Sequence, residues 1–273
     1  MQSKTENGVP PVERRPARRK RSVDTSARTS PDFVEALARG LSVLKCFEPG
    51  VRSLGNIEIA ERTGLARSTV SRLVYTLLSL GYLRYDAESG RYSPGYGVLE
   101  LGFGCLANLE VRTLARPLME SLARETGAAV ALGTFDGRAM VYVEAIHGSS
   151  ALYLRLPVGH RMDMNSTMGR TYLASLEADE REALMDSLEL PTSMESILNR
   201  ACTDFRETAC CYGIGDWKPG INAVATAFSA ISGEGVFVMS CGGPADLLPE
   251  DILRKEVGPR LAAMVNKLSL PRA

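Results

Sequence analysis

The sequence has no run of about 18 consecutive apolar residues, the length that a membrane-spanning helix needs. Its start, MQSKTENGVPPVERRP, lacks the apolar core of a secretion signal. Six cysteines occur at irregular spacings in 273 residues, which is typical of reduced thiols rather than of a disulfide framework. These absences predict a cytoplasmic protein with no membrane contact.

Residue types typical of an enzymatic or metal site are also scarce. The chain has two histidines, His147 and His160, no GxSxG nucleophile elbow and no CxxC pair. Cys210 and Cys211 are adjacent, so their thiols do not easily face one tetrahedral metal ion. A Ser-His-Asp triad needs a histidine held by a carboxylate beside a nucleophile, and no motif indicates one. We therefore expect no catalysis, no metal and no cofactor.

The composition is that of a globular protein, with 45% hydrophobic and 23% charged residues, and the length allows two domains. The net charge of zero hides an asymmetry. Residues 1–94 carry 16 Lys and Arg against 10 Asp and Glu, whereas residues 95–273 carry 16 against 22. A basic half predicts contact with nucleic acid or a membrane. Residues 1–30, expected to be a disordered basic tail, contribute much of this excess, so charge alone decides little.

Residues 31–94 have the pattern of three helices and a hairpin. Apolar residues first recur at helical spacing: Phe33, Leu37, Leu41, Leu44 and Phe47. A short helix is expected over about 57–62, with Asn56 as its cap and Gly64 as its stop. A third helix is expected over about 66–80, and then YLRYD and RYSP flank a glycine-containing turn. This is the outline of a winged helix-turn-helix.

The third helix has an apolar face and a polar face. The apolar face comprises Val70, Leu73, Val74 and Leu77. The opposite face centres on Ser68, Arg72, Tyr75 and Ser79. A recognition helix places such residues in the major groove, where Arg72 is suited to a bidentate contact with guanine. A solvated polar face is the alternative interpretation.

Residues 95–127 predict two helical segments, YGVLELGFGCLANLE and VRTLARPLMESLARETG, with Pro117 as a boundary or kink. The first segment is either a packed linker helix or a dimer seam. Residues 128–273 then predict strands at AAVALGTF, AMVYVEAI, ALYLRLPV, NAVATAFSA and GVFVMSCG. Helices are expected over about 167–176, 178–186, 194–211 and 249–268. This order favours an α+β domain with a largely antiparallel sheet.

Several segments together resemble the IclR-type bacterial transcription regulators. The amino-terminal ones are ARGLSVLKCF, NIEIAERTGLARSTVSRLVYTLLSLGYL and GRYSPGYGVLELG, and the later ones are GTFDGRAMVYVEA, VGHRMDMNSTMGRTYLASL, GINAVATAF and VMSCGGPADLLP. The resemblance implies a winged helix-turn-helix (31–94), linker and dimerisation helices (95–127) and a GAF-like α+β effector domain (128–273). It also implies a homodimer or dimer of dimers that binds palindromic operators in double-stranded DNA and responds to small organic acids.

By this resemblance the recognition helix matches Arg67–Leu80 and the wing matches Tyr82–Ser93. The expected DNA contacts are Arg67, Ser68, Thr69, Ser71, Arg72, Arg84 and Arg91. We expect Arg72 and Thr69 to read bases, and the two wing arginines to position the protein on phosphates. The basic tail at Arg14–Arg21 either adds salt-sensitive, nonspecific affinity or only keeps the chain soluble.

The resemblance places the ligand pocket at nine residues: Met162, Met164, Thr167, Met168, Gly169, Asp216, Ile221, Ala223 and Ser240. Backbone N–H groups near the start of the helix at Thr167 suit a carboxylate, and the methionines suit an adaptable apolar wall, although core packing also accounts for them. Ser240 as the single hydroxyl in SCGGP leaves room for a larger or less polar acid than pyruvate. Candidate counter-charges are Arg155, Arg161 and Arg170, with a surface position as the alternative for each.

The sequence therefore predicts a sequence-specific DNA-binding transcriptional regulator controlled by a small organic-acid ligand. The alternative is a metabolite-binding or catalytic α+β protein whose helix-turn-helix mediates protein contacts. A second alternative is nonspecific nucleic-acid binding through the basic tail.

Overall fold

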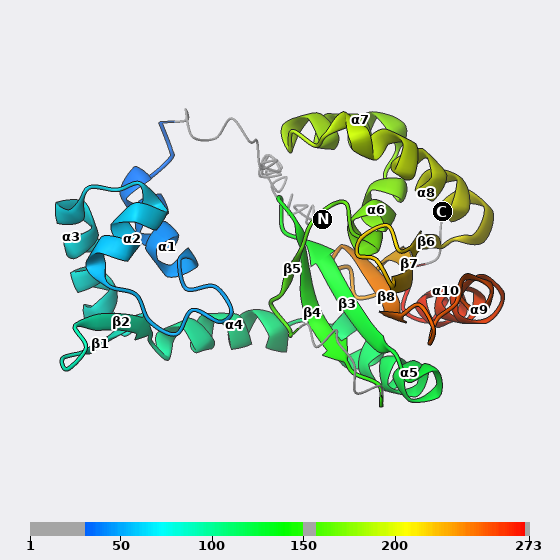
Figure 1. Ribbon diagram of the computed structural model, residues 1–273, viewed down its shortest axis with the longest axis horizontal. Coiled ribbons are helices and arrows are strands. Elements are labelled where there is room, and N and C mark those ends of the chain that lie inside the picture. Colours follow the sequence, from blue (N-terminus) through cyan, green and yellow to red (C-terminus); the bar gives the residue numbers. More distant parts are fainter. Residues whose placement is uncertain (1–30, 150–156, 271–273) are drawn as a thin grey trace, which may run out of the picture. The chain divides into compact units, whose positions relative to one another are not determined.

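The computed structural model describes residues 31–149 and 157–270 (Figure 1). Three expectations fall outside these residues: the basic tail, most of the strand expected over 151–158, and the counter-charge Arg155. Within the described residues, no helix is long and apolar enough to cross a membrane.

The amino-terminal part contains three helices and a hairpin, as expected. The elements are α1 (Glu35–Lys45), α2 (Asn56–Thr63), α3 (Arg67–Ser79), β1 (Leu83–Asp86) and β2 (Arg91–Pro94). Apolar side chains from all five elements share one core, to which Val43, Ile59 and Val74 contribute fully buried residues. Tyr92 of β2 also exchanges two backbone hydrogen bonds with Leu54, which joins the hairpin to the segment before α2. The winged helix-turn-helix outline is confirmed.

The expected cap of α2 is wrong by one position. Gly55 is the N-cap, and its backbone N–H donates to Glu58 Oε2 at 2.7 Å. Asn56 is the first helical residue, and its side-chain amide donates instead to Ser71 Oγ of α3 at 2.7 Å. The helix ends as expected at Gly64, which has a left-handed φ of 68° that glycine adopts without strain.

Two further helices follow the hairpin, α4 (Gly97–Ala107) and α5 (Glu110–Thr126). The break between them falls at Asn108–Leu109. Pro117 lies inside α5, so it is not a boundary, and the alternative of a kink stays a prediction. The carboxylate of Glu234 accepts hydrogen bonds from the backbone N–H groups of Glu110 and Val111 at 2.5 and 3.0 Å. The first N–H groups of a helix have no acceptor within the helix, and here the carboxylate of Glu234 accepts from two of them and caps α5.

The carboxy-terminal part is built on a six-stranded antiparallel sheet with the strand order β5-β4-β3-β8-β7-β6 (Figure 1). Its strands are β3 (Ala129–Phe135), β4 (Met140–Ile146), β5 (Arg161–Met162), β6 (Cys211–Ile214), β7 (Ile221–Ser229) and β8 (Val236–Pro244). Hairpins β3–β4 and β7–β8 meet at the central β3–β8 pairing. The four long strands confirm the alternating segments and the antiparallel sheet expected from the sequence.

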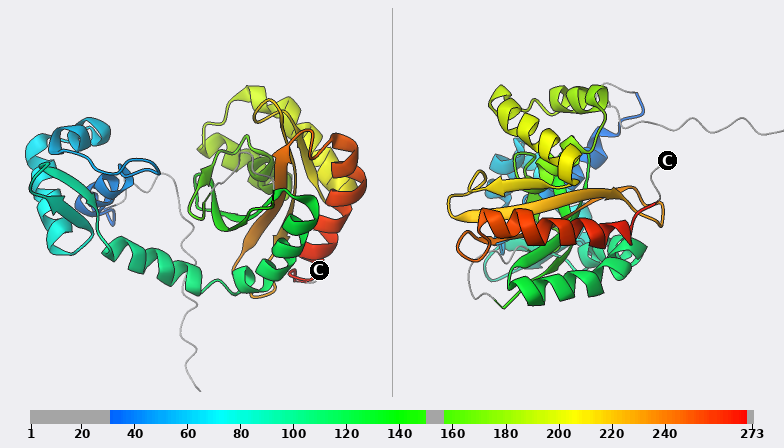
Figure 2. Two further views of the ribbon diagram at one scale, coloured as in Figure 1. Left: turned by 60° about the horizontal axis from the view of Figure 1, so that its bottom comes forward. Right: turned by 90° about the vertical axis from the view of Figure 1, so that its right-hand side faces the viewer.

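Helices cover both faces of this sheet (Figure 2). The helices beyond α5 are α6 (Thr167–Ala174), α7 (Ala178–Ser187), α8 (Glu195–Thr208) and α10 (Gly258–Asn266). One core lies between the sheet and α5 with α10, and a second lies between the sheet and α6 with α8. Along β8, Phe237, Met239 and Cys241 lie in the first core, and Val238 lies in the second. This alternation is the two-residue period of a strand.

Two elements late in the chain differ from expectation. The helix expected over 194–211 ends at Thr208, Ala209 has a left-handed φ of 58°, and β6 follows as an edge strand paired with β7. The final helix, expected over 249–268, comprises α9 (Glu250–Ile252), a π-helical turn (Leu253–Val257) and α10. Pro259 stands at the start of α10, and because proline has no N–H for the regular ladder, a widened turn precedes it.

Candidate DNA-binding face and ligand pocket

Helix α3 has one buried and one exposed face. Val70, Val74 and Leu77 are buried in the amino-terminal core. The predicted contact residues lie on the remaining surface, where Arg67, Ser68, Ser71 and Arg72 are exposed and Thr69 is half-buried. Within residues 31–149 and 157–270, the guanidinium of Arg72 has no hydrogen-bond or ion-pair partner. Its five N–H donors are therefore available to an external acceptor.

Two residues on the exposed face of α3, Ser71 and Tyr75, differ from the prediction in their contacts or in their selection. Ser71 Oγ accepts from Asn56 at 2.7 Å and donates to the carbonyl oxygen of Arg67 at 3.0 Å, so Ser71 also ties α3 to α2. Tyr75 is 72% exposed one turn after Ser71, and it was not among the predicted DNA contacts. The helical period places it on the polar face, but a neutral phenol gave no charge signal.

In the wing, Arg91 has partners within the chain. Its Nε donates to Ser53 Oγ at 3.0 Å, and its Nη2 forms a 2.8 Å ion pair with Glu58 of α2. The N–H of Gly55 and the Arg91 guanidinium hold the pKa of Glu58 below its ordinary value. Arg91 thus fixes the hairpin to the start of α2.

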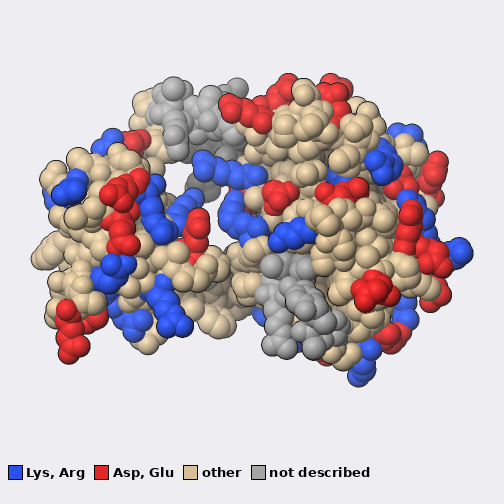
Figure 3. Space-filling view, in the orientation of Figure 1, with Lys and Arg blue, Asp and Glu red and all other residues tan. Residues whose placement is uncertain are grey.

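Arg84 lies on the outside of the wing. Its guanidinium stacks 4.6 Å from the ring centre of Tyr96, and its Nε donates to the carbonyl oxygen of Pro94 at 3.2 Å. The phosphate contacts expected of both wing arginines stay predictions. On the visible face of the amino-terminal part, Lys and Arg side chains alternate with Asp and Glu rather than forming one basic surface (Figure 3).

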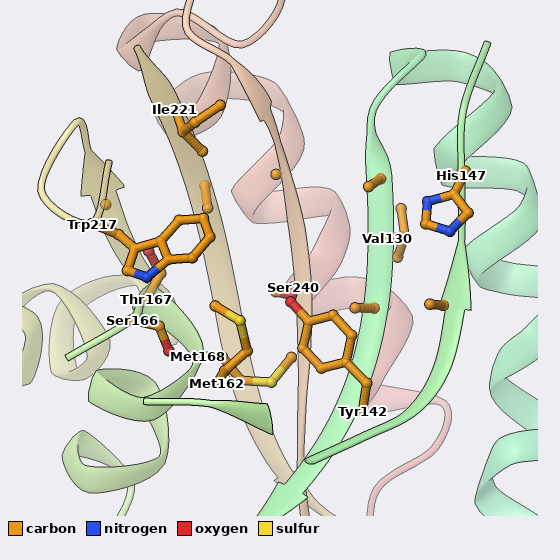
Figure 4. Close-up of a pocket in the computed structure, with 16 residues that line it drawn as sticks. Val130, Tyr142, His147, Met162, Ser166, Thr167, Met168, Trp217, Ile221 and Ser240 are labelled. Carbon is orange, nitrogen blue, oxygen red and sulfur yellow. The ribbon is translucent and has the colours of Figure 1, made fainter. Parts of the chain in front are cut away.

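A pocket lies between the sheet and the start of α6, with about 640 Å³ of empty space including its mouth (Figure 4). Six of the nine predicted ligand residues line it: Met162, Thr167, Met168, Ile221, Ala223 and Ser240. The rest of the wall comes from strands β3, β4, β6 and β8, from Ser166 before α6, and from the segments that follow β4 and β6.

The other three predicted ligand residues lie beside the pocket rather than in its wall. Met164 is 3% exposed and packs in the core between the sheet and α6 with α8. Gly169 touches the backbone of Met164 so closely that an added Cβ would collide with it. Asp216 forms a 3.1 Å ion pair with Arg170. These positions support the pocket but do not face its contents.

Three large side chains of the wall were not predicted: Tyr142, His147 and Trp217. Tyr142 and Ser240 lie side by side between Trp217 at one end and His147 at the other (Figure 4). Burial raises the pKa of Tyr142 to about 12, with a hydrogen bond to Ser240 acting in the opposite direction. The phenol therefore keeps its proton at neutral pH and can donate. No local sequence pattern marks these residues, because they meet only in the folded sheet.

Among the lining residues that the structure describes there is no Asp, Glu, Lys or Arg. The polar side-chain groups of the wall are the hydroxyls and ring nitrogens of Tyr142, His147, Ser166, Thr167, Trp217 and Ser240. At the start of α6, Ser166 Oγ accepts from the N–H of Gly169 at 3.1 Å. The N–H groups of Thr167 and Met168 have no acceptor among the described residues. A helix start with unpaired N–H groups favours an anion.

The two described counter-charge candidates are both in ion pairs. Arg161 is exposed and pairs with Asp136, whereas Arg170 is buried and pairs with Asp216; neither lines the pocket. Within the described ranges, no group of three or more His, Cys, Asp or Glu residues could hold a metal ion. The arrangement suits binding of a small, partly apolar molecule.

Comparison with known proteins assigns both parts of the chain. The "IclR helix-turn-helix domain" matches residues 36–87, and "Bacterial transcriptional regulator IclR C-terminal" matches residues 103–270. The HTH-type transcriptional regulator TsaQ1/TsaQ2 of Comamonas testosteroni is 30% identical over 244 residues, covering 86% of this chain and 87% of that protein. The HTH-type transcriptional regulator XynR of Escherichia coli is 28% identical over 201 residues, covering 71% and 79%.

A solved structure agrees over nearly the whole chain. The IclR family transcriptional regulator from Brucella abortus has a TM-score of 0.79 at 41% identity, covering 90% of this chain and 94% of that one. These relatives are transcriptional regulators and not enzymes. The helix-turn-helix, the curled antiparallel sheet and both family matches agree: the chain belongs to the IclR family of DNA-binding transcriptional regulators.

Proposed function

We propose that two copies of the chain bind a palindromic operator and that a small organic acid in the pocket controls their affinity for it. One observation carries the assignment of the ligand. The unpaired N–H groups of Thr167 and Met168 lie at the wall of a cavity that is otherwise mainly apolar. An acid with an apolar body satisfies both features, since its carboxylate accepts from the helix start and its body fills the cavity.

The apolar wall favours an acid with an aromatic or branched body. Trp217, Met162 and Met168 offer flat and adaptable surfaces to such a body. An IclR homolog from Microbacterium hydrocarbonoxydans has been solved in complex with 4-hydroxybenzoate. That protein is 21% identical to this chain, so the likeness is one of fold. The choice of benzoates as first probes rests on the chemistry of the present pocket.

For DNA, we assign base readout to Arg72 and Thr69 on α3 and backbone positioning to the wing arginines. The exposed, unpartnered guanidinium of Arg72 supports this division, because a bidentate contact with guanine needs a free fork of donors. We divide the chain after residue 94, where the wing ends, and after residue 127, where Gly127 ends α5 with a φ of 68°. Residues 95–127 then form the connection through which ligand and DNA affect each other.

Dimerisation is assigned to α4, because none of its residues is buried within one copy. Leu99, Leu101 and Phe103 are 55%, 60% and 66% exposed, which is a large apolar surface for a single helix. Pairing with the same helix of a second copy would cover it and present two α3 helices to a palindrome.

The substitution Phe103→Glu is expected to convert the dimer into monomers, because it places a charge at the centre of the paired apolar surfaces. Sedimentation velocity at micromolar concentration measures the result. Leu247→Glu makes the same change at an exposed site outside α4 and should leave the dimer intact. A Phe103→Glu protein that still sediments as a dimer would place the interface elsewhere.

The β7–β8 hairpin connects the pocket with the linker. Ile221, Ala223 and Ser240 of this hairpin line the pocket, and Glu234 at its turn caps the first turn of α5. Leu109, the N-cap residue of α5, makes no side-chain hydrogen bond to the start of the helix. We assign to this hairpin the transmission of a change at the pocket to the junction between α4 and α5.

Replacing Glu234 with glutamine is expected to lower the free energy of unfolding at pH 7 by roughly 1 kcal/mol, as for a lost helix cap. Burial alone would raise the pKa of Glu234, but hydrogen bonds from Ser232 and from the N–H groups of Val111 and Glu110 hold it below its ordinary value. A carboxyl with a depressed folded-state pKa contributes stability above its unfolded pKa and loses it as pH falls through the folded pKa.

The stability difference between wild type and Glu234→Gln should therefore shrink between pH 7 and about pH 4, because the unfolded carboxyl begins to protonate at about pH 5 and the folded one only at lower pH. Thermal unfolding followed by circular dichroism measures it. Glu182→Gln, at an exposed position of α7, is the matched control and should change stability little at either pH. An unchanged difference across this pH range would contradict the capping role.

The proposed function is tested by selecting genomic fragments with the purified full-length protein at moderate salt and sequencing those retained. An enriched palindrome supports the dimeric readout and supplies the operator for the measurements below. Retention without a shared sequence would contradict it and leave only the electrostatic attraction of the basic tail. Repeating the selection with 4-hydroxybenzoate present should change the yield of the palindrome, whereas the alternative of a helix-turn-helix that contacts only proteins predicts no enrichment at all.

A further inference from the structure

Arg170 is buried, although the sequence suggested a surface position as one alternative for it. It is the fourth residue of α6 and is 2% exposed, which makes it the largest fully buried side chain that the structure describes. An arginine is rarely removed from water unless it is paired. Its surroundings therefore indicate what the guanidinium binds.

Only one end of this guanidinium is paired within the chain. Nη1 donates to Asp216 Oδ2 at 3.1 Å. Nη2 is buried, and among residues 31–149 and 157–270 it has no acceptor. A buried charged donor without an acceptor is destabilising, so an anionic oxygen placed at Nη2 would be bound strongly.

The free nitrogen lies directly behind the pocket wall. Gly213 of β6 and Thr167 of α6 both line the pocket. A Cβ added to Gly213 would be 3.0 Å from Arg170 Nη2 and would collide with Thr167 Oγ1. Because residue 213 has no side chain, the Thr167 hydroxyl fills the space beside it, next to the guanidinium and at the pocket wall.

The partner of Nη1 is on the same loop as a pocket residue. Asp216 immediately precedes Trp217, in the loop between Gly215 and Gly220. These two glycines have positive φ values of 69° and 77°, which makes the loop tight at both ends. The ion pair between Arg170 and Asp216 therefore ties the loop that carries Trp217 to α6.

We propose that Arg170 determines the specificity of the pocket for acids. The Thr167 side chain rotates aside, Nη2 donates to the anionic group of the ligand beside Gly213, and Asp216 keeps Nη1. This inference rests on the proposed function, because it assigns a residue to the acid group of the ligand. The carboxylate of Asp216 balances the charge of Arg170 and so limits how tightly an anion binds. An uncharged analogue of the same shape lacks the charge-assisted hydrogen bond and binds less tightly.

Trp217 is the single tryptophan of the chain and lines the pocket, so its fluorescence reports occupancy. We would titrate the full-length protein with benzoate, 4-hydroxybenzoate and pyruvate, and with the corresponding amides. Arg170→Met should weaken binding of the acids roughly 10- to 100-fold and change binding of the amides by less than about threefold. Arg170→Lys should restore part of the preference for acids, since it restores the charge but not the planar fork.

Asp216→Asn gives an expectation of opposite sign. The asparagine oxygen still accepts from Nη1, but the balancing negative charge is lost, so the acids should bind several-fold more tightly. Arg161→Met is the matched control: Arg161 is exposed, pairs with Asp136 and does not line the pocket, so its loss should leave both ligand classes unchanged. Thermal melting of each variant shows whether it is folded.

Two results would overturn the proposal while the proposed function stands. The first is a folded Arg170→Met protein that still prefers the acids to the amides; the exposed Lys218, 4.5 Å from the Trp217 ring centre, would then be the remaining cation at the loop. The second is weaker acid binding by Asp216→Asn. This variant also tests the proposal if the Arg170→Met protein does not fold. If none of the three acids binds the wild-type protein, the ligand assignment of the proposed function fails, and the role of Arg170 fails with it.

Discussion

Replacing Arg72 with alanine is expected to weaken binding to the operator roughly 10- to 100-fold at fixed salt, while binding to unrelated duplex DNA changes by less than about threefold. Arg72 is exposed on α3, and its guanidinium has no partner in the described part of the chain. Its donors match the O6 and N7 acceptors of guanine, so its loss removes discrimination between sequences. Fluorescence anisotropy with the operator and with a shuffled duplex of the same composition measures both affinities.

Arg84→Ala is the matched control, because it removes the same charge from the wing. If Arg84 contacts phosphate, its loss should weaken the operator and the shuffled duplex equally and should reduce the salt slope by about 1. Its stacking on Tyr96 is also lost, and the melting temperature of the amino-terminal part reports that effect separately. An Arg72→Ala protein that keeps the full preference for the operator would contradict the assignment of Arg72 to base readout.

The other large effect is expected for Gly169→Ala, which should lower the free energy of unfolding of the carboxy-terminal part by roughly 2–3 kcal/mol. A Cβ at residue 169 would collide with the Cα, carbonyl carbon and oxygen of Met164, and backbone atoms cannot rotate away as a side chain can. The start of α6 would have to move, and with it Thr167 and Met168 in the pocket wall. Acid binding should therefore fall together with stability. Urea unfolding followed by Trp217 fluorescence measures the stability.

Gly243→Ala in β8 is the control for this prediction. A Cβ there would meet Ala128, Leu247 and Leu248 at 3.5–3.6 Å, which is ordinary van der Waals contact. Its effect should stay within roughly 1 kcal/mol, because no backbone has to move. If Gly169→Ala unfolds at the wild-type urea concentration and binds acids normally, the close approach of α6 to Met164 does not determine the pocket.

Most helices and strands could be predicted because their patterns are local. The spacing of Val70, Val74 and Leu77 predicted helix α3, and these residues form its buried face. The apolar segment GVFVMSCG predicted strand β8, whose residues are buried alternately on the two faces of the sheet. Strand β6 was missed because it has four residues, and its burial comes from pairing with β7. The start of α5 was predicted to within one residue, but its cap, Glu234, could not be predicted because it lies 124 residues after Glu110.

The pocket could be predicted only in part for the same reason. The resemblance transfers positions within motifs, and six of those positions line the cavity. Tyr142 lies in a segment that carries the resemblance but was not among the nine positions, and Trp217 lies in a loop outside those segments; both reach the cavity only through the fold. The resemblance also assigned Met164 and Gly169 to the wall, but they pack beside it. For Arg170, charge alone favours a surface position, and its burial depends on Asp216 in a loop far along the chain.

The central claim is that an acid in the pocket and operator DNA affect each other's binding. The most direct test measures operator affinity with and without a saturating acid, and acid affinity through Trp217 fluorescence with and without saturating operator. Because such coupling is reciprocal, we predict that the two affinities change by the same factor, in the typical range of about 5- to 150-fold, whichever its sign. Occupancy of the pocket by the acid with no change in operator affinity would contradict the account.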